Sequence, residues 1–348
     1  MALTERQMMI LKAIIDDYIA TGIPVGSRTL SKRGDMNISS ATIRNEMADL
    51  EEGGYLEQPH TSAGRMPSDK AYRLYVDTLM KVSRLNQGEI TFIRGYLNQK
   101  MGKLSSVIDA TAKVLSEMTN LTSLVLAPQP AQVEIRRIQI VKLSEHKALL
   151  LFVFDTGMVR DMVIDVPEEL SPYEMEALSN LLTDKVSHQR FADAVQAVRE
   201  SAAGDIELHR SFMESLLDAV QAGLRPAAAK DVVLGGAKNI LNHPEYRDVN
   251  KAKNFLTLLE TKDTLYDMLA RSTDMEFTIR IGKENELSEL QDMSIITATY
   301  RVGDKKLGSF GVIGPTRMNY AKIISVLRCV SASMNEILKY YLTDESRN

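Results

Sequence analysis

The segment from Ser39 to Asp77 constrains the fold more than any other part of the chain, because a helical pattern is followed at once by a hairpin pattern. Ile43, Met47 and Leu50 recur at the spacing of one helix face, and two glycines after Glu52 end the helix. The hairpin pattern has a strand over 55–58, a turn-rich tip over 59–64 and a returning strand over 65–67. A helix followed by such a β-ribbon wing indicates a domain that binds double-stranded DNA.

Two shorter helical patterns precede this segment. Thr4 is placed to cap a first helix that ends before Gly22, and Ser27 to cap a second that ends near Lys32. A turn then leads to Ser39. Three helices joined by tight turns and followed by a ribbon predict an N-terminal winged helix-turn-helix domain over residues 1–85.

The outward face of the third helix is expected to read DNA bases. With the apolar stripe buried, a step of about 100° per residue turns the other side chains outward. The outward set is Ala41, Thr42, Arg44, Asn45 and Ala48. Arginine and asparagine present the paired groups that recognise guanine and adenine, and alanine permits contact with thymine methyl groups. Asp49, Glu51 and Glu52 cluster at the other end of this helix, so we expect its N-terminus to enter the major groove.

Polar residues around that helix are expected to contact the phosphate backbone or the neighbouring groove. They are Arg28, Lys32, Arg33, Ser39 and Ser40 near the helix starts, and His60, Thr61, Ser62 and Arg65 in the wing. The alternative is that these side chains are only solvated, as most exposed polar residues are. The combination of three helices, a ribbon and an apolar stripe favours DNA binding, whereas for His60 alone the two interpretations weigh equally.

Charge placement matters more than total charge. The chain has a net charge of −4 and a pI near 5.9, which argues against coating nucleic acid through bulk positive charge. From Ser27 to Arg73, seven basic residues are balanced by seven acidic ones. Because a single helix reads only a few base pairs, we expect a homodimer that reads an inverted repeat, with the rest of the chain dimerising, sensing or both.

Beyond a boundary near 84–88 the patterns predict a mixed α/β body and an α+β multidomain protein. Strand patterns cover 123–126, 135–143, 149–155, 158–166, 231–235, 276–281, 295–302 and 305–313, and a long helix covers 319–342. A helix-rich tract opens at Ser171 and resembles an insertion. We therefore expect a discontinuous α/β domain over 86–170 and 272–348, with an inserted domain over 171–271. The apolar seam of the last helix suits a dimer contact, but packing on its own sheet is favoured.

Other classes of function find little support. The five histidines are too dispersed for a local two-histidine metal spacing, and neither a P-loop nor a nucleophile elbow is present, so we expect no catalytic residues, no metal and no cofactor. The longest apolar run, 148–154, has seven residues, too few to cross a bilayer, so no membrane association is expected. The single cysteine, Cys329, excludes an internal disulfide and fits a cytoplasmic protein.

Three stretches closely resemble the HrcA family of bacterial heat-inducible transcription repressors. They are the region from SSATIRNEMADLEE to PSDKAYRLYVD, the motif VLGGAKNIL from Val233, and LGSFGVIGPTRMNY from Leu307. The resemblance implies a homodimeric negative regulator with a winged-helix domain, a GAF-like α/β domain and a dimerising domain inserted into it. It also implies binding to the CIRCE inverted repeat upstream of chaperonin and chaperone operons, with activity maintained by the chaperonin.

One alternative stays open. A GAF-like fold permits a pocket without proving one, so the chain is alternatively a ligand-gated transcription regulator whose GAF-like domain binds a small-molecule effector.

Overall fold

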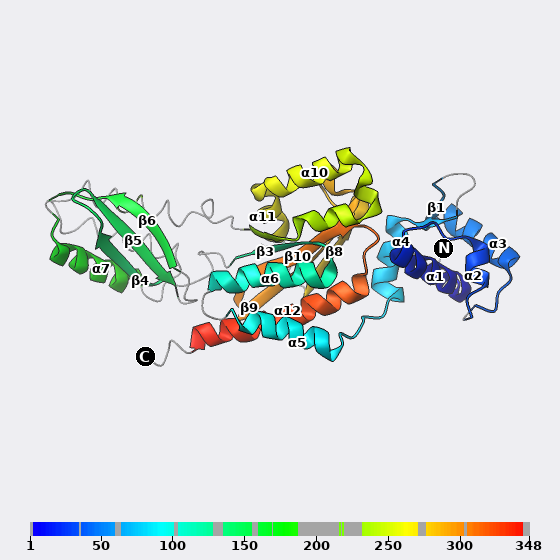
Figure 1. Cartoon of the computed structure of the whole chain (residues 1–348), viewed down its shortest axis with the longest axis horizontal. Coiled ribbons are helices and arrows are strands. Elements are labelled where there is room, and N and C mark those ends of the chain that lie inside the picture. The colour runs from blue at the N-terminus through cyan, green and yellow to red at the C-terminus, as the bar shows by residue number, and fades with distance from the viewer. Residues whose placement is uncertain are drawn as a thin grey trace.

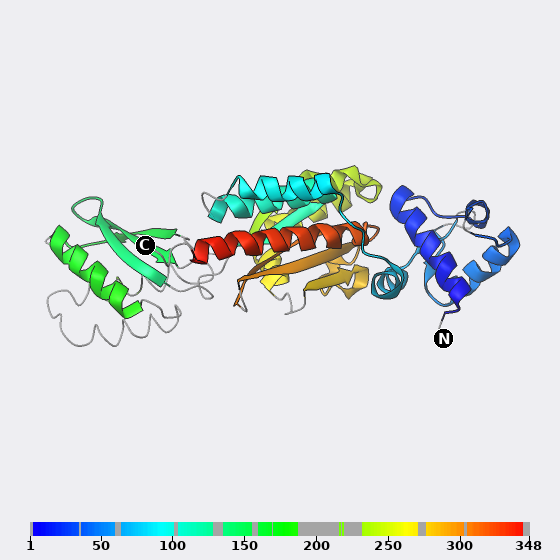
Figure 2. The same ribbon diagram turned by 90° about the horizontal axis from the view of Figure 1, so that it is seen from below.

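The computed structural model divides the chain into three units along one long axis. It describes residues 3–34, 36–59, 64–100, 104–127, 135–154, 159–168, 170–186, 216, 218, 232–270, 276–302 and 305–343. An N-terminal head lies at one end, a body in the middle and a smaller distal unit at the other end (Figure 1). The perpendicular view gives the same order (Figure 2). The expectation of a multidomain α+β protein is confirmed.

The head is built from short helices and a two-stranded ribbon. Its elements are α1 (Glu5–Thr21), α2 (Ser27–Ser31), α3 (Ser40–Glu52), β1 (Leu56–Glu57), β2 (Met66–Pro67), α4 (Asp69–Leu74) and the π-helical turn η1 (Tyr75–Leu79). Strands β1 and β2 are antiparallel, with Leu56 opposite Pro67. The predicted apolar stripe of α3 is confirmed, because Ile43, Met47 and Leu50 are all buried. The head therefore closes around one small core and leaves the other face of α3 outside.

The body is a five-stranded antiparallel sheet between two layers of helices. The strand order is β7 (Val232–Gly235), β3 (Thr122–Leu126), β10 (Lys305–Pro315), β9 (Met293–Val302) and β8 (Phe277–Ile281). One layer contains α5 (Gln87–Asn98), α6 (Leu104–Thr119) and α12 (Tyr320–Thr343), and the other contains α10 (Val249–Glu260) and α11 (Lys262–Ala270). Short 3-10 turns η5 (Ala237–Asn242), η6 (Pro244–Arg247), η7 (Gly282–Glu284) and η8 (Ser288–Leu290) link these elements.

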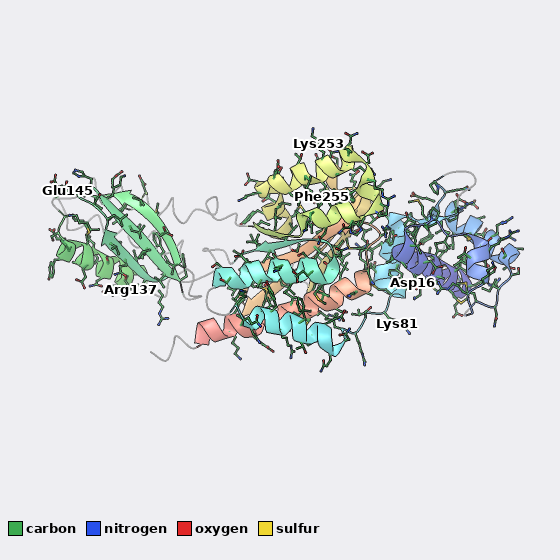
Figure 3. All side chains as sticks on the ribbon, viewed as in Figure 1. Asp16, Lys81, Arg137, Glu145, Lys253 and Phe255 are labelled. Carbon is green, nitrogen blue, oxygen red and sulfur yellow. The ribbon has the colours of Figure 1, made fainter. Side chains whose placement is uncertain are left out.

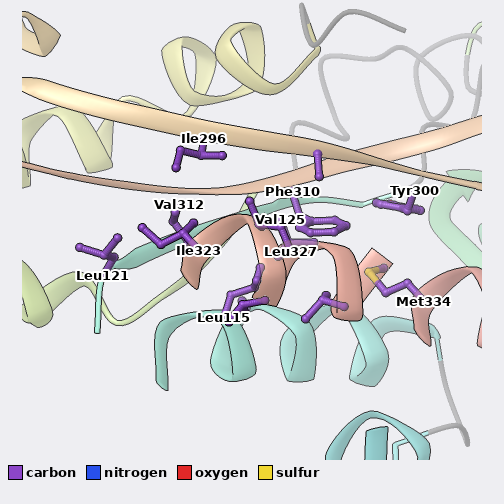
Figure 4. Packing of buried hydrophobic residues seen from close by; sticks show 14 of the residues in the cluster. Leu115, Leu121, Val125, Ile296, Tyr300, Phe310, Val312, Ile323, Leu327 and Met334 are labelled. Carbon is purple, nitrogen blue, oxygen red and sulfur yellow. The ribbon is translucent and has the colours of Figure 1, made fainter. Parts of the chain in front are cut away.

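Successive side chains along a strand point to opposite faces of the sheet, so each strand contributes residues to both helix layers. Ile296 and Val312 pack towards Leu115 of α6 and Leu327 of α12 (Figure 4). The adjacent residues Ile295 and Ile313 belong instead to the cluster beneath α10 and α11, with Phe255 and Leu269 among its other members. On α10, Phe255 is fully buried while Lys253 is exposed (Figure 3). The body is thus a three-layered sandwich with two cores.

The long final helix packs within its own chain. Its seam residues Ile323, Leu327, Val330, Met334 and Ile337 are buried in the core cluster that includes the sheet. The preference for packing on its own sheet over a dimer seam is confirmed. None of the helices in the described ranges is both long and apolar enough to span a membrane.

The distal unit is an antiparallel meander with one helix beside it. It contains β4 (Ile135–Lys142), β5 (Lys147–Phe154), β6 (Val159–Asp165) and α7 (Pro172–Val186). Arg137 lies on β4, and Glu145 lies between β4 and β5 (Figure 3). Helix α7 covers the β4 edge, because Ser179 Oγ accepts the Ile140 N–H at 2.9 Å and Thr183 Oγ1 accepts the Ile138 N–H at 3.1 Å. An edge whose N–H groups are satisfied in this way is protected from adding another strand.

The domain limits expected from the sequence do not coincide with this division. Among the described residues, the strands within 135–165 pair only with one another, although the sequence placed them in the main α/β domain. Conversely, β7 pairs with β3, and α10 and α11 cover the body sheet, although the sequence placed 232–270 in the insertion. Periodicity identifies a strand but not its partner, so the limits at 171 and 271 are corrected to limits near 135 and 232. Most of 187–231 lies outside the described residues.

Candidate nucleic-acid interface

The start of α3 is held by side-chain hydrogen bonds. Ser39 is its N-cap, and the Ser39 Oγ accepts the Thr42 N–H at 3.1 Å. The two hydroxyls of Ser39 and Thr42 also lie 2.9 Å apart, which explains why Thr42 is only half-exposed. Ser27 does not cap α2 as expected: Gly26 occupies the cap position, and Ser27 Oγ instead lies 3.2 Å from Ser40 Oγ. The starts of α2 and α3 are thus joined.

The outward face of α3 is available to a ligand. Ala41, Arg44, Asn45 and Ala48 are exposed, one or two positions away from the buried stripe. Within the described part of the chain, neither Arg44 nor Asn45 has a side-chain hydrogen bond or ion pair. Two unpaired polar side chains next to two alanines form a surface that can approach the edges of bases.

The candidate phosphate contacts fall into two groups. Arg28 and Lys32 are exposed and have no ion-pair partner among the described residues, so their charges face solvent. Arg33 is different, because its Nη1 donates to Asp17 Oδ1 at 2.8 Å and to the Ala13 carbonyl at 3.4 Å. Arg33 therefore ties the end of α2 to α1, a role that sequence spacing gave no reason to expect.

The base of the ribbon is attached to the helices. Arg65 Nε donates to Glu51 Oε2 at 2.8 Å, and the backbone groups of Arg65 and Val25 exchange two hydrogen bonds of 2.9 Å. Gly64 is required beside this bridge, because a Cβ there would lie 2.6 Å from the Val25 carbonyl carbon and oxygen. The tip residues His60, Thr61 and Ser62 lie outside the described residues. The structure thus places the root of the ribbon beside α3.

The charges of α3 are polarised along its axis. Its first turn has no acidic residue, whereas Asp49, Glu51 and Glu52 lie near its end. Because the helix dipole is positive at the N-terminus and negative at the C-terminus, the acidic residues strengthen this polarity. Lys70 offsets part of it by donating to the Gly53 carbonyl at 2.8 Å. An anion is therefore favoured at the start of α3 and disfavoured at its end.

The head is joined to the body through α4 (Asp69–Leu74). Arg73 forms a two-pronged ion pair with Glu284 of η7 and donates to the Ile279 carbonyl at 2.7 Å. The hydrogen bond from Glu284 raises the pKa of Arg73, so the guanidinium stays charged. Asp69 Oδ2 accepts the Lys283 N–H at 3.0 Å. These partners lie more than 200 positions apart, and no local pattern signals such a pairing.

A second connection reaches the end of α1. Arg317 donates to the Ile19 carbonyl at the end of α1 at 3.3 Å and pairs with Glu245 of η6. The rings of Tyr72 and Tyr320 also meet, with centroids 5.9 Å apart. The body therefore holds the head through both α1 and α4, which fixes the direction in which α3 faces.

A small helical head with an open polar helix face, carried in a fixed direction by a larger body, defines a transcription regulator. The comparisons with known proteins agree. A family model described as the HrcA protein C-terminal domain matches residues 105–324. The chain belongs to the HrcA family.

Three relatives illustrate this membership, and each is named heat-inducible transcription repressor HrcA. The protein from Halalkalibacterium halodurans is 39% identical over 97% of this chain and 98% of its own length. Those from Brevibacillus brevis and Desulforamulus reducens are 42% and 41% identical over the same shares. A crystal structure of a hypothetical protein, 22% identical, shares the fold with a TM-score of 0.66 over 98% of this chain and 100% of that one.

Proposed function

We propose that this chain represses heat-shock genes by placing α3 in the major groove of DNA, N-terminus first. One observation carries the proposal: Arg44 and Asn45 are exposed and unpaired, beside a capped helix start that favours a phosphate. In this arrangement Ala41, Thr42, Arg44, Asn45 and Ala48 face the bases. The head is then a winged helix-turn-helix domain with β1 and β2 as its wing, and the three-layered body is GAF-like.

We assign the contacts to the DNA backbone to side chains that are exposed and have no ion-pair partner within the described part of the chain. Arg28 and Lys32 are the leading phosphate ligands because their charges are unpaired, and the hydroxyls of Ser39 and Ser40 lie at the helix start. His60, Thr61 and Ser62 at the wing tip are assigned to a neighbouring groove. Arg33 and Arg65 already have carboxylate partners. We therefore propose that they stabilise the head, and that each contacts phosphate only while it stays paired with its carboxylate.

We further propose that two copies bind the two halves of the CIRCE inverted repeat upstream of chaperonin and chaperone operons, in the cytoplasm. The distal unit is the proposed dimer contact, in place of the wider tract expected from the sequence. Its outer sheet face aligns Val141, Leu149 and Val163 directly across three strands. Val163 and Val159 are each 55% exposed and Val141 is 39% exposed. An apolar sheet face of this kind suits a partner surface.

Val163→Asp tests the dimer contact. A carboxylate on this face must be desolvated on association, so we expect the dimer to weaken by at least ~2 kcal/mol, or roughly 30-fold. Sedimentation equilibrium measures the change. Val249→Asp is the matched control, because Val249 is 78% exposed on the body and lies outside the distal unit. Equal dimerisation of both variants and the parent would exclude this face.

The family resemblance also supports dependence on the chaperonin, and we propose that the chaperonin keeps the chain in its active, DNA-binding form. Footprinting on DNA upstream of a chaperonin operon tests target and dependence together. We expect protection that is symmetric about the inverted repeat, and a larger protected fraction when chaperonin and ATP are added. Asymmetric protection would count against the dimer on DNA, and an unchanged fraction would count against the chaperonin.

A further inference from the structure

A cavity of about 170 Å³ lies in the body, away from the DNA-facing surface. It lies between α11, strands β8 and β9 and the segment that joins those strands, and it is open to solvent where Asp267, Glu286 and Leu287 are exposed. Its lining residues are Thr264, Asp267, Met268, Arg280, Asn285, Glu286, Leu287, Leu290 and Ile295. The walls therefore combine four apolar residues with five polar or charged ones, so a bound molecule would meet both an apolar surface and groups of both charges.

Asn285 lines this cavity, and its side chain carries a buried acceptor. Its side chain is 3% exposed, and its Nδ2 lies within 3.0 Å of the carbonyls of Gly282, Leu290 and Met293. These carbonyls fix the orientation of the amide, because the opposite orientation would set an oxygen against three oxygens. Its Oδ1 has no hydrogen-bond partner among the described residues. A buried acceptor without a donor is costly, so a donor on a bound molecule would be favoured.

Arg280, Asp267 and Glu286 are the charged residues of the lining, and the side chains of the first two are without partners in the described part of the chain. Arg280 is half-buried, lines the cavity and forms no ion pair within the described ranges, so its guanidinium is free to bind a carboxylate. Asp267 lines the same cavity as an exposed carboxylate, also without a partner there. Met268, Leu290 and Ile295 leave an apolar wall between these polar groups. A molecule with one carboxylate, one ammonium group and a short apolar side chain complements all of these features.

We propose that this cavity binds a small apolar α-amino acid. Its carboxylate pairs with Arg280, and its ammonium group donates to Asn285 Oδ1 and faces Asp267. Since an apolar cavity of about 150 Å³ holds benzene, about 170 Å³ suits an amino acid of the size of valine or leucine and excludes nucleotides.

The site is connected to the head through three residues. Asn285 donates to the Gly282 carbonyl, and η7 (Gly282–Glu284) binds α4 through the Lys283 N–H and the Glu284 carboxylate. The fit at Gly282 is tight, because its φ is +53° and a Cβ there would lie 2.0 Å from Asp69 Oδ2. A ligand that holds Asn285 therefore acts on the segment that orients the head. This coupling rests on the proposed DNA-binding function, whereas the ligand site does not.

Calorimetry with the full-length chain tests the site directly. The probes are valine, leucine, 4-methylpentanoate, which lacks the ammonium group, and 3-methylbutylamine, which lacks the carboxylate. We expect saturable binding of valine or leucine and weaker binding of both partial analogues. Arg280→Gln should weaken amino-acid binding at least about 10-fold, because the carboxylate loses a charged partner. Asp267→Asn should reduce the preference for leucine over 4-methylpentanoate, and Arg247→Gln, an exposed control outside the cavity, should change neither value.

Circular dichroism and thermal melting verify that each variant is folded. If Arg280→Gln does not fold, the analogue preference of Asp267→Asn decides the matter, because Asp267 is exposed. Absence of binding by all four probes to the parent chain, or undiminished binding to a folded Arg280→Gln variant, overturns the site.

A mobility-shift assay with and without leucine tests the coupling to the head. An affinity change of roughly 5- to 150-fold is the usual range for two linked sites and would support it. Leucine binding with no change in DNA affinity overturns the coupling. A chain that binds leucine but no inverted repeat overturns the proposed function and leaves the ligand site intact.

Discussion

The full-length chain is expected to bind an intact inverted repeat roughly 10²- to 10⁴-fold more tightly than either half-site alone. The physical reason is that the second head of a dimer binds intramolecularly once the first is placed, at an effective concentration set by the geometry between the heads. Here the body fixes that geometry, since Arg73 and Arg317 connect it to the head through α4 and α1. Fluorescence anisotropy with matched duplexes measures both affinities at one salt concentration.

The control for this prediction keeps the sequence of both half-sites and changes only their spacing. Inserting about five base pairs, half of a helical turn, moves the second half-site to the opposite side of the duplex. A dimer with fixed heads should then bind no better than to a half-site. If the spaced repeat binds as tightly as the parent repeat, the heads are not held as the contacts of Arg73 and Arg317 indicate. Equal affinity for half-site and full site would exclude a dimer on DNA.

Helix α3 was predictable because the signals that define it are local. Ser39 caps it, Ile43, Met47 and Leu50 bury one stripe, and two glycines follow its last residue. All of these signals lie within about four turns of chain and act through nearest neighbours. The strands of the body and distal unit were likewise found near their expected positions, because alternation of apolar residues is also a local signal.

Assignments that depend on distant partners were not predictable. The pattern at 231–235 predicted a strand, but only its pairing with β3, over 100 positions earlier, places it in the body. Arg33 and Arg65 read as free cations from the sequence, whereas Asp17 and Glu51 hold them in the fold. Asn285 belongs to no recognisable sequence motif. Its proposed role in ligand binding depends on its contacts with three backbone carbonyls and on its position at the cavity. Sequence spacing contains no direct record of such contacts.

Arg44→Ala and Asn45→Ala are expected to abolish most discrimination between the inverted repeat and random DNA. Each bidentate contact to a base is worth ~1–3 kcal/mol of discrimination. Because a dimer carries two copies, each substitution should cost about 2–6 kcal/mol on the full site, provided that the two half-sites contribute additively. Competition binding against shuffled DNA of the same length measures this quantity. Neither substitution should lower the melting temperature appreciably, because both side chains are exposed and unpaired.

The variant Arg28→Ala distinguishes base recognition from electrostatic attraction to the phosphate backbone. Arg28 is exposed on α2 and is assigned to a phosphate contact. Its removal should therefore weaken binding to specific and to random DNA about equally. It should also lower the salt dependence of binding by about one ion per head. If Arg44→Ala and Asn45→Ala lose the same amount of affinity for specific and for random DNA, α3 contacts only the DNA backbone. The opposite charges of the two ends of α3 would then steer the head electrostatically, and base selection would have to come from another surface.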